Sequence, residues 1–81
     1  MKLHIIVTCE RPPNSKGPWP DEQRWHSKIT KFKQLDFYAD DDDTISTQTF
    51  EVNEHNCYRL LTTLLSFSFV TKIEVKVPTK E

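Results

Sequence analysis

The sequence predicts a small α+β fold of the ferredoxin-like type, in which two helices cover one face of a four-stranded antiparallel sheet. Segments rich in Ile, Val, Thr and Phe alternate with segments of helical spacing, in the order β-α-β-β-α-β. One segment, residues 54–66, has a clear helical repeat of leucines. The chain of 81 residues has room for one core, so we expect a single domain spanning residues 1–81.

The first strand is predicted from Lys2 to Cys9. Leu3, Ile5, Val7 and Cys9 share one face at a period of two residues. Because Ile6 lies on the second face and is also apolar, we expect this strand to be central.

Residues 10–20 are predicted to form an irregular loop. Four prolines in this stretch remove backbone donors and restrict φ, which prevents both helix and ladder formation. Trp19 stands between two of them, Pro18 and Pro20. Tryptophan is enriched at binding hot spots, so an exposed Trp19 would be a candidate contact residue, whereas a Trp19 folded over the core would be structural.

Residues 21–33 allow two interpretations. As a helix, they place Trp25, Ile29 and Phe32 on one face, with acidic residues first and basic residues last, as the helix dipole favours. As a strand, they mix lysines with Ile29 on one face. We favour the helix. The strand alternative gives the order β-β-β-α-β, with one helix packed on the sheet.

The second and third strands are predicted at residues 34–39 and 44–52, with Leu35 and Phe37 pointing inward. The acidic run at residues 40–43 lies between them, and we expect it to form a hairpin tip because Asp favours turns. A calcium loop beginning at Asp40 would place Ile45 where an EF-hand needs Gly, so no metal site is predicted. Recognition of the run by a basic partner stays open.

The second helix is predicted from residue 54 to residue 66, with Asn53 as its N-cap. Its apolar face consists of Cys57, Leu60, Leu61, Leu64 and Leu65. The last strand is predicted at residues 69–77, with Ile73, Val75 and Val77 inward and charged residues outward. These charges and the following proline are typical of an edge strand.

Several functions are excluded by composition. Gly17 is the single glycine, so no phosphate-binding loop, dinucleotide turn or nucleophile elbow is present. The two cysteines, Cys9 and Cys57, are expected at opposite ends of the sheet, too far apart for a disulfide or a shared zinc site. We therefore expect no cofactor and no catalytic residues. The absence of a long apolar run predicts a cytoplasmic protein that does not enter the membrane.

The remaining features favour a non-enzymatic protein-binding regulatory module, such as an inhibitor, adaptor or accessory factor. Such a chain could be encoded by a virus or mobile element, which composition does not decide. The predicted contact residues are Trp19, the basic set Arg24, Lys28, Lys31 and Lys33, and the acidic set Asp40, Asp41, Asp42 and Asp43. We expect Trp19→Ala to abolish partner binding without changing the melting temperature.

Two alternatives remain open. One is an RNA- or DNA-binding protein that uses the basic helix face to contact phosphates. The less favoured one is a small nuclease assisted by a metal at the aspartates. An exposed edge strand would also permit a dimer, although the oligomeric state is not specified.

Overall fold

The predicted ferredoxin-like order β-α-β-β-α-β is confirmed. The computed structural model describes residues 1–12, 19 and 21–78. Its elements are β1 (Lys2–Glu10), α1 (Glu22–Ile29), β2 (Lys33–Ala39), β3 (Ile45–Asn53), α2 (Glu54–Leu65) and β4 (Val70–Lys76). The favoured helix within residues 21–33 is therefore present, but it ends at Ile29, and Lys33 already belongs to β2.

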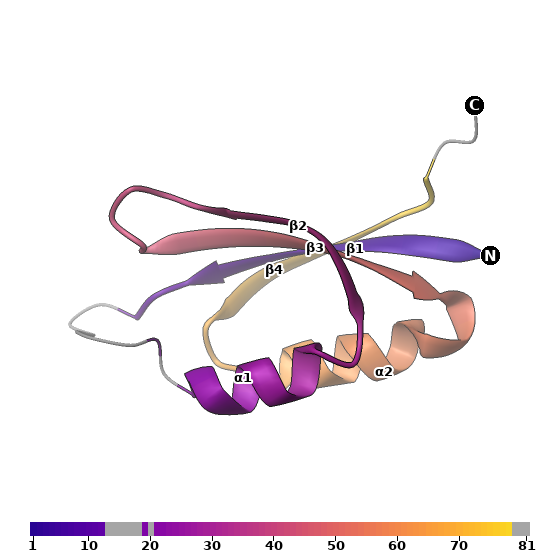
Figure 1. Ribbon diagram of the computed structural model, residues 1–81, viewed down its shortest axis with the longest axis horizontal. Helices are drawn as coiled ribbons and strands as arrows, with labels where there is room; N and C mark the ends of the chain where they lie inside the picture. Colours follow the sequence, from indigo (N-terminus) through magenta and orange to yellow (C-terminus); the bar gives the residue numbers. More distant parts are fainter. Residues whose placement is uncertain (13–18, 20, 79–81) are drawn as a thin grey trace.

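The sheet has four antiparallel strands in the order β2-β3-β1-β4, and both helices lie on the same face of it (Figure 1). β1 is central, as its two apolar faces predicted. It pairs with β3 without interruption from Lys2↔Asn53 to Glu10↔Ile45. It pairs with β4 from His4↔Lys76 to Cys9↔Val70, with a register shift between Thr8 and Cys9.

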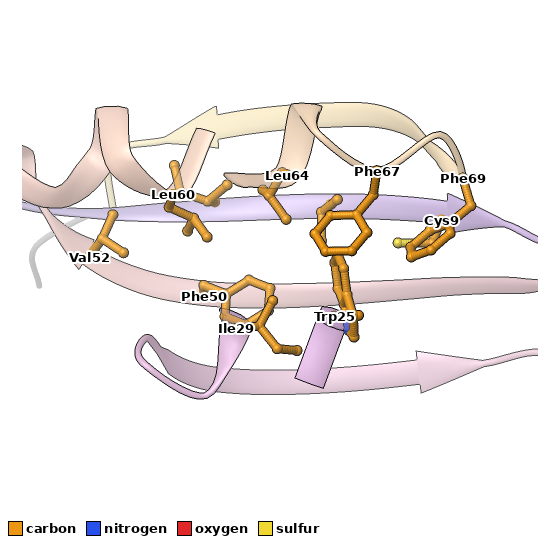
Figure 2. Close-up of a cluster of buried hydrophobic side chains, with 11 residues drawn as sticks. Cys9, Trp25, Ile29, Phe50, Val52, Leu60, Leu64, Phe67 and Phe69 are labelled. Atoms are coloured by element: carbon orange, nitrogen blue, oxygen red, sulfur yellow. The ribbon is translucent and has the colours of Figure 1, made fainter. Parts of the chain in front are cut away.

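The core lies between this sheet and the two helices (Figure 2). α1 contributes Trp25 and Ile29, as its spacing predicted, and α2 contributes Leu60 and Leu64. The sheet contributes the alternating buried residues Ile5, Val7, Cys9, Phe50 and Val52. Burying each large aliphatic side chain stabilises the fold by about 1.5–3 kcal/mol.

An aromatic cluster closes one end of the core. Phe67 and Phe69, which lie between α2 and β4, stand edge-on to Trp25 with ring centroids 5.0 Å and 5.4 Å away. Figure 2 shows the three rings grouped next to Cys9. Such edge-to-face pairs contribute about 0.5–1.5 kcal/mol beyond their buried area.

Leu35 and Phe37 of β2 are predicted to point into the core, but neither side chain is buried. The β2–β3 register shifts between Gln34↔Phe50 and Asp36↔Thr49, so Leu35 is an extra, exposed residue in a bulge. Phe37 follows the bulge opposite Gln48 on the helix side of the sheet, yet its exposed fraction is 58%. α1 is too short and too narrow a cover to bury an edge strand.

The predicted burial at the other edge of the core is also wrong in part. Leu65 is 72% exposed at the end of α2, although its spacing places it next to the buried leucines. Val75 shares a sheet face with its partner Ile5 but is 47% exposed, and Val77 lies beyond the end of β4. Spacing assigns a face to a residue, whereas burial also needs a neighbouring element above that face.

Candidate partner-binding pocket

A pocket of about 280 Å³ opens between the start of α1 and the β2–β3 hairpin. Four aromatic side chains line it: Trp19, Trp25, Phe37 and Phe69. Cys9, Ser46 and Gln48 line it from the sheet, and the charged or ionisable lining residues are Arg11, Glu22, His26 and Asp43. The pocket thus combines apolar walls with a few polar groups, which is typical of ligand and partner sites.

Trp19 is half-buried in this pocket rather than projecting from the surface. Its indole Nε1–H donates to Asp43 Oδ2 at 3.1 Å, and its ring stands edge-on to Phe69 with centroids 5.6 Å apart. The Arg11 guanidinium lies 5.3 Å from the Trp19 ring centroid and donates to the same Asp43 oxygen at 3.0 Å. Trp19 is therefore folded over the core and has a structural role, so Trp19→Ala is expected to lower the stability of the protein. Residues 13–18 and 20 of the proline-rich loop lie outside the described residues.

The four aspartates form the turn between β2 and β3. Asp40 accepts hydrogen bonds from the Thr44 hydroxyl at 2.6 Å, the Thr44 amide at 2.7 Å and the Ile45 amide at 3.2 Å. These bonds, that of the Thr44 hydroxyl above all, hold the pKa of Asp40 below its usual value. Asp43 has a left-handed backbone with φ of 55°, which Asp tolerates. In this acidic run, Asp40 and Asp43 therefore shape the turn, whereas Asp41 and Asp42 present exposed carboxylates.

The sheet side of the pocket holds unreactive groups. Burial raises the pKa of the Cys9 thiol to about 11, even though a hydrogen bond with Ser46 acts in the opposite direction. Cys9 is therefore a neutral thiol at physiological pH and a poor nucleophile. The buried Gln48 side chain accepts a hydrogen bond from Gln34 Nε2 at 2.8 Å, which satisfies its carbonyl oxygen.

Titratable groups at the pocket do not form a metal site within the part of the chain that the structure describes, where no three His, Cys, Asp or Glu side chains converge. His26 and Glu22 lie one helical turn apart, with 3.7 Å between Nε2 and Oε2. Both side chains face solvent, where such a contact contributes little.

The predicted basic residues do not form one surface. Arg24 lies over the Phe67 ring, 4.1 Å from its centroid, and donates to the Ser66 carbonyl at 3.3 Å, so it links α1 to the end of α2. Lys28 and Lys31 are exposed and have no polar partner among the described residues. Lys33 lies at the start of β2, where its ammonium group is 3.4 Å from Glu51.

Glu51 lies among three basic side chains on the sheet face away from the helices. Lys2 and His4 of the neighbouring β1 each approach its carboxylate at 3.6 Å, in addition to Lys33. Partial burial alone would raise the pKa of Glu51, but the charges of Lys2 and Lys33 outweigh that effect and lower it. The charge of Lys33 is thus balanced by the carboxylate of Glu51. Lys33 lies on the sheet face away from the helices, whereas Arg24 and Lys28 belong to α1 on the other face.

Several pocket residues were not among those predicted from the sequence. Arg11 and Phe69 are distant in sequence from Trp19, and only the folded chain brings them together. Phe37 was assigned to the core because alternation gives the face of a residue but does not show that β2 is an edge strand. The nearest available signal was its position next to the acidic turn, since an aromatic residue near a hairpin tip has few neighbours to cover it.

No protein-family model matches the sequence, and comparison with curated proteins and with solved structures found no significant match. None of the described helices is long and apolar enough to span a membrane.

Proposed function

We propose that this protein is a non-enzymatic, regulatory binding module whose contact surface is the aromatic pocket together with the β2–β3 hairpin tip. The observation that carries the proposal is the position of Phe37 at the pocket, with 58% of its surface exposed beside the half-buried Trp19. A large exposed aromatic side chain next to an apolar pocket is typical of a binding hot spot. The partner is a protein.

The size of the pocket favours one inserted side chain over a cofactor. Its volume of about 280 Å³ lies at the lower end of the range of about 300–1,000 Å³ found for small-molecule and cofactor sites. An anchor side chain of a protein partner would place its apolar part against Phe37 and Trp19. Such aromatic contacts commonly dominate the affinity of an interface.

The charge around the pocket favours a basic segment of the partner. Asp43 is already engaged by Arg11 and Trp19, but the adjacent Asp41 and Asp42 are exposed and have no cationic partner within the described residues. Complementary charge accelerates association and sets the orientation of a complex. Lysines or arginines beside the anchor residue of the partner would meet these two carboxylates.

The pocket residues give little support to catalysis. Cys9 is held as a thiol by burial, and the Asp43 carboxylate accepts hydrogen bonds from two side chains. A catalytic base needs a nearby proton to accept and a matched pKa. Rigid, hydrogen-bonded side chains of this kind suit recognition better.

The proposal can be tested by affinity capture with three baits: the native chain, Phe37→Ala and Tyr38→Ala. Tyr38 is the matched control, since it is the next aromatic residue, is 64% exposed and faces the opposite side of the sheet. Each captured sample is split, and one half is treated with nuclease. Captured proteins are quantified by mass spectrometry, and direct binding of the purified candidate is then measured by calorimetry.

We expect one stoichiometric protein to be held by the native chain and by Tyr38→Ala, with affinity lowered at least tenfold by Phe37→Ala. A tenfold loss corresponds to about 1.4 kcal/mol. Equal binding by Phe37→Ala and the native chain would overturn the proposed surface. Capture that disappears with nuclease would instead favour nucleic acid as the partner.

A further inference from the structure

The edge formed by β4 lies at the opposite end of the sheet from the pocket. β4 has one neighbour, β1, because the strand order ends there. Its helix-side residues Ile73 and Val75 alternate with Lys72, Glu74 and Lys76 on the other side. Val75 and the following Val77 are 47% and 64% exposed. An edge strand with exposed apolar residues is a template for pairing with another chain.

A helix flank extends this apolar surface. Asn56 of α2 lines a surface pocket with Lys31 and Phe32, and Ser66 accepts a hydrogen bond from Arg24, so this flank of α2 faces α1. At 3.6 residues per turn, Tyr58, Leu61 and Leu65 lie on the opposite flank.

That opposite flank faces β4. The aromatic pocket is lined by residues of α1 and by Phe37 of β2, so α1 lies near β2. β2 and β4 are the two opposite edge strands of the sheet. α2 therefore lies on the β4 side of α1, with Tyr58 and Leu65 facing outward, where both are more than two-thirds exposed. Exposed apolar side chains on a strand edge and on the neighbouring helix flank together mark an interaction surface.

A second copy of this chain matches that surface in charge. When β4 pairs with β4 of a second copy in antiparallel direction, the numbers of any two opposed residues add up to the same sum. An even sum places one residue, the centre, opposite its own copy. A pairing centred on Glu74 opposes Glu74 to Glu74 and Lys72 to Lys76, which is repulsive. Pairings with an odd sum place apolar residues opposite charged ones and turn the two helix layers to opposite faces.

Two centres remain that oppose unlike charges. A centre at Ile73 opposes Lys72 to Glu74 but sets Val75 against Thr71. A centre at Val75 opposes Glu74 to Lys76 twice, pairs Val75 with its own copy, and pairs Ile73 with Val77. The second centre matches Ile73, Val75 and Val77 with apolar residues.

We propose that the protein forms a two-fold symmetric dimer through antiparallel β4–β4 pairing centred on Val75. The two sheets then join into one sheet of eight strands, with all helices on one face. Exposed backbone groups of β4 gain partners, and Val75 and Val77 become covered. The start of α2 lies at the same end of the sheet as Val75, since the Glu54 amide bonds to the Met1 carbonyl, so Tyr58 approaches the dyad.

Site-directed crosslinking tests the register. Val75→Cys and Ile73→Cys are made in a Cys57→Ser background, leaving only the buried Cys9 in addition. Opposed Cβ atoms lie about 4.5–5.5 Å apart in an antiparallel pair, close to disulfide reach. Centring at Val75 separates the two Ile73 positions by four residues, or about 13 Å along the strand. We expect rapid oxidation to a covalent dimer for Val75→Cys alone.

Charge exchange tests the same register without cysteine chemistry. Glu74→Lys replaces each Glu74–Lys76 ion pair across the dyad with two facing cations. Light scattering should then show a shift from dimer to monomer. Adding Lys76→Glu exchanges the pair and should restore the dimer for the Val75 centre but not for the Ile73 centre. A native chain that scatters as a monomer up to its solubility limit would overturn the proposal, as would crosslinking of Ile73→Cys alone. Neither result bears on the pocket, which uses the other end of the sheet.

Discussion

The indole N–H of Trp19 donates to the carboxylate of Asp43 at 3.1 Å, which joins the end of the proline-rich loop to the tip of the β2–β3 hairpin. Arg11 donates to the same oxygen and lies against the same ring. These contacts of Trp19 and Arg11 with Asp43 tie the two segments together. Trp19, Arg11 and Asp43 together form one wall of the aromatic pocket.

Asp43→Ala should release Trp19 and lower the free energy of unfolding by about 1–2 kcal/mol, from the lost hydrogen bonds and from the left-handed backbone that alanine tolerates poorly. The change is measured by denaturant unfolding. The Trp19 indole resonance in an NMR spectrum should move at the same time.

Two matched variants define this effect. Asp43→Asn keeps an oxygen acceptor and the left-handed backbone, so we expect a smaller loss. Asp42→Ala removes a neighbouring exposed aspartate and should leave both stability and the indole resonance unchanged. An equal response to Asp42→Ala would show that the acidic run acts through its total charge.

Arg24→Ala should destabilise the protein by about 1 kcal/mol, because the guanidinium covers Phe67 and bonds to Ser66 at the junction of α1 and α2. Lys28→Ala, one turn later on α1, is the matched control and should leave the free energy of unfolding within about 0.5 kcal/mol of the native value. Thermal melts of both variants would decide. Equal melting temperatures would contradict a structural role of Arg24.

Leu64→Ala should lower the free energy of unfolding by about 2–5 kcal/mol, since Leu64 is fully buried and its removal leaves a cavity. Leu65→Ala, at 72% exposed, should cost less than about 0.5 kcal/mol. Urea unfolding of dilute protein keeps self-association out of the comparison. Similar losses for the two leucines would mean that α2 is rotated relative to its position here.

The Cys9 thiol should make stability fall in alkaline solution. Its folded-state pKa of about 11 lies above the ordinary value of 9.0, so the folded chain holds the proton more tightly than the unfolded chain does. This contribution is complete below pH 9 and is lost as the pH rises from 9 to 11. The loss amounts to at most about 2–3 kcal/mol.

Cys9→Ala provides the comparison, because the variant differs from the native chain only in lacking this thiol. Unfolding free energies are measured from pH 8 upward, and the native chain should show the steeper decline. Parallel curves would show that Cys9 does not remain protonated in the folded state. The buried thiol should also resist alkylation at neutral pH, whereas the half-buried Cys57 reacts.

Local sequence patterns determined the order of the elements and most of the core. The two-residue alternation of Ile5 and Val7, and the helical spacing of Leu60 and Leu64, depend on neighbours along the chain, so they can be recognised without the fold. The acidic turn also depends on residues close in sequence, because Asp40 accepts hydrogen bonds from the backbone amides of Thr44 and Ile45 at the other end of the turn.

Only the tertiary structure decided which apolar residues are covered and where the pocket lies. Phe37, Leu65 and Val75 have the spacing of core residues, but no described helix or strand covers them, because β2 and β4 are edge strands and the two helices do not extend over both. The contact between Trp19 and Asp43 spans 24 residues. Local pattern specifies the face of a residue, whereas exposure and long-range pairing depend on how the elements are placed together.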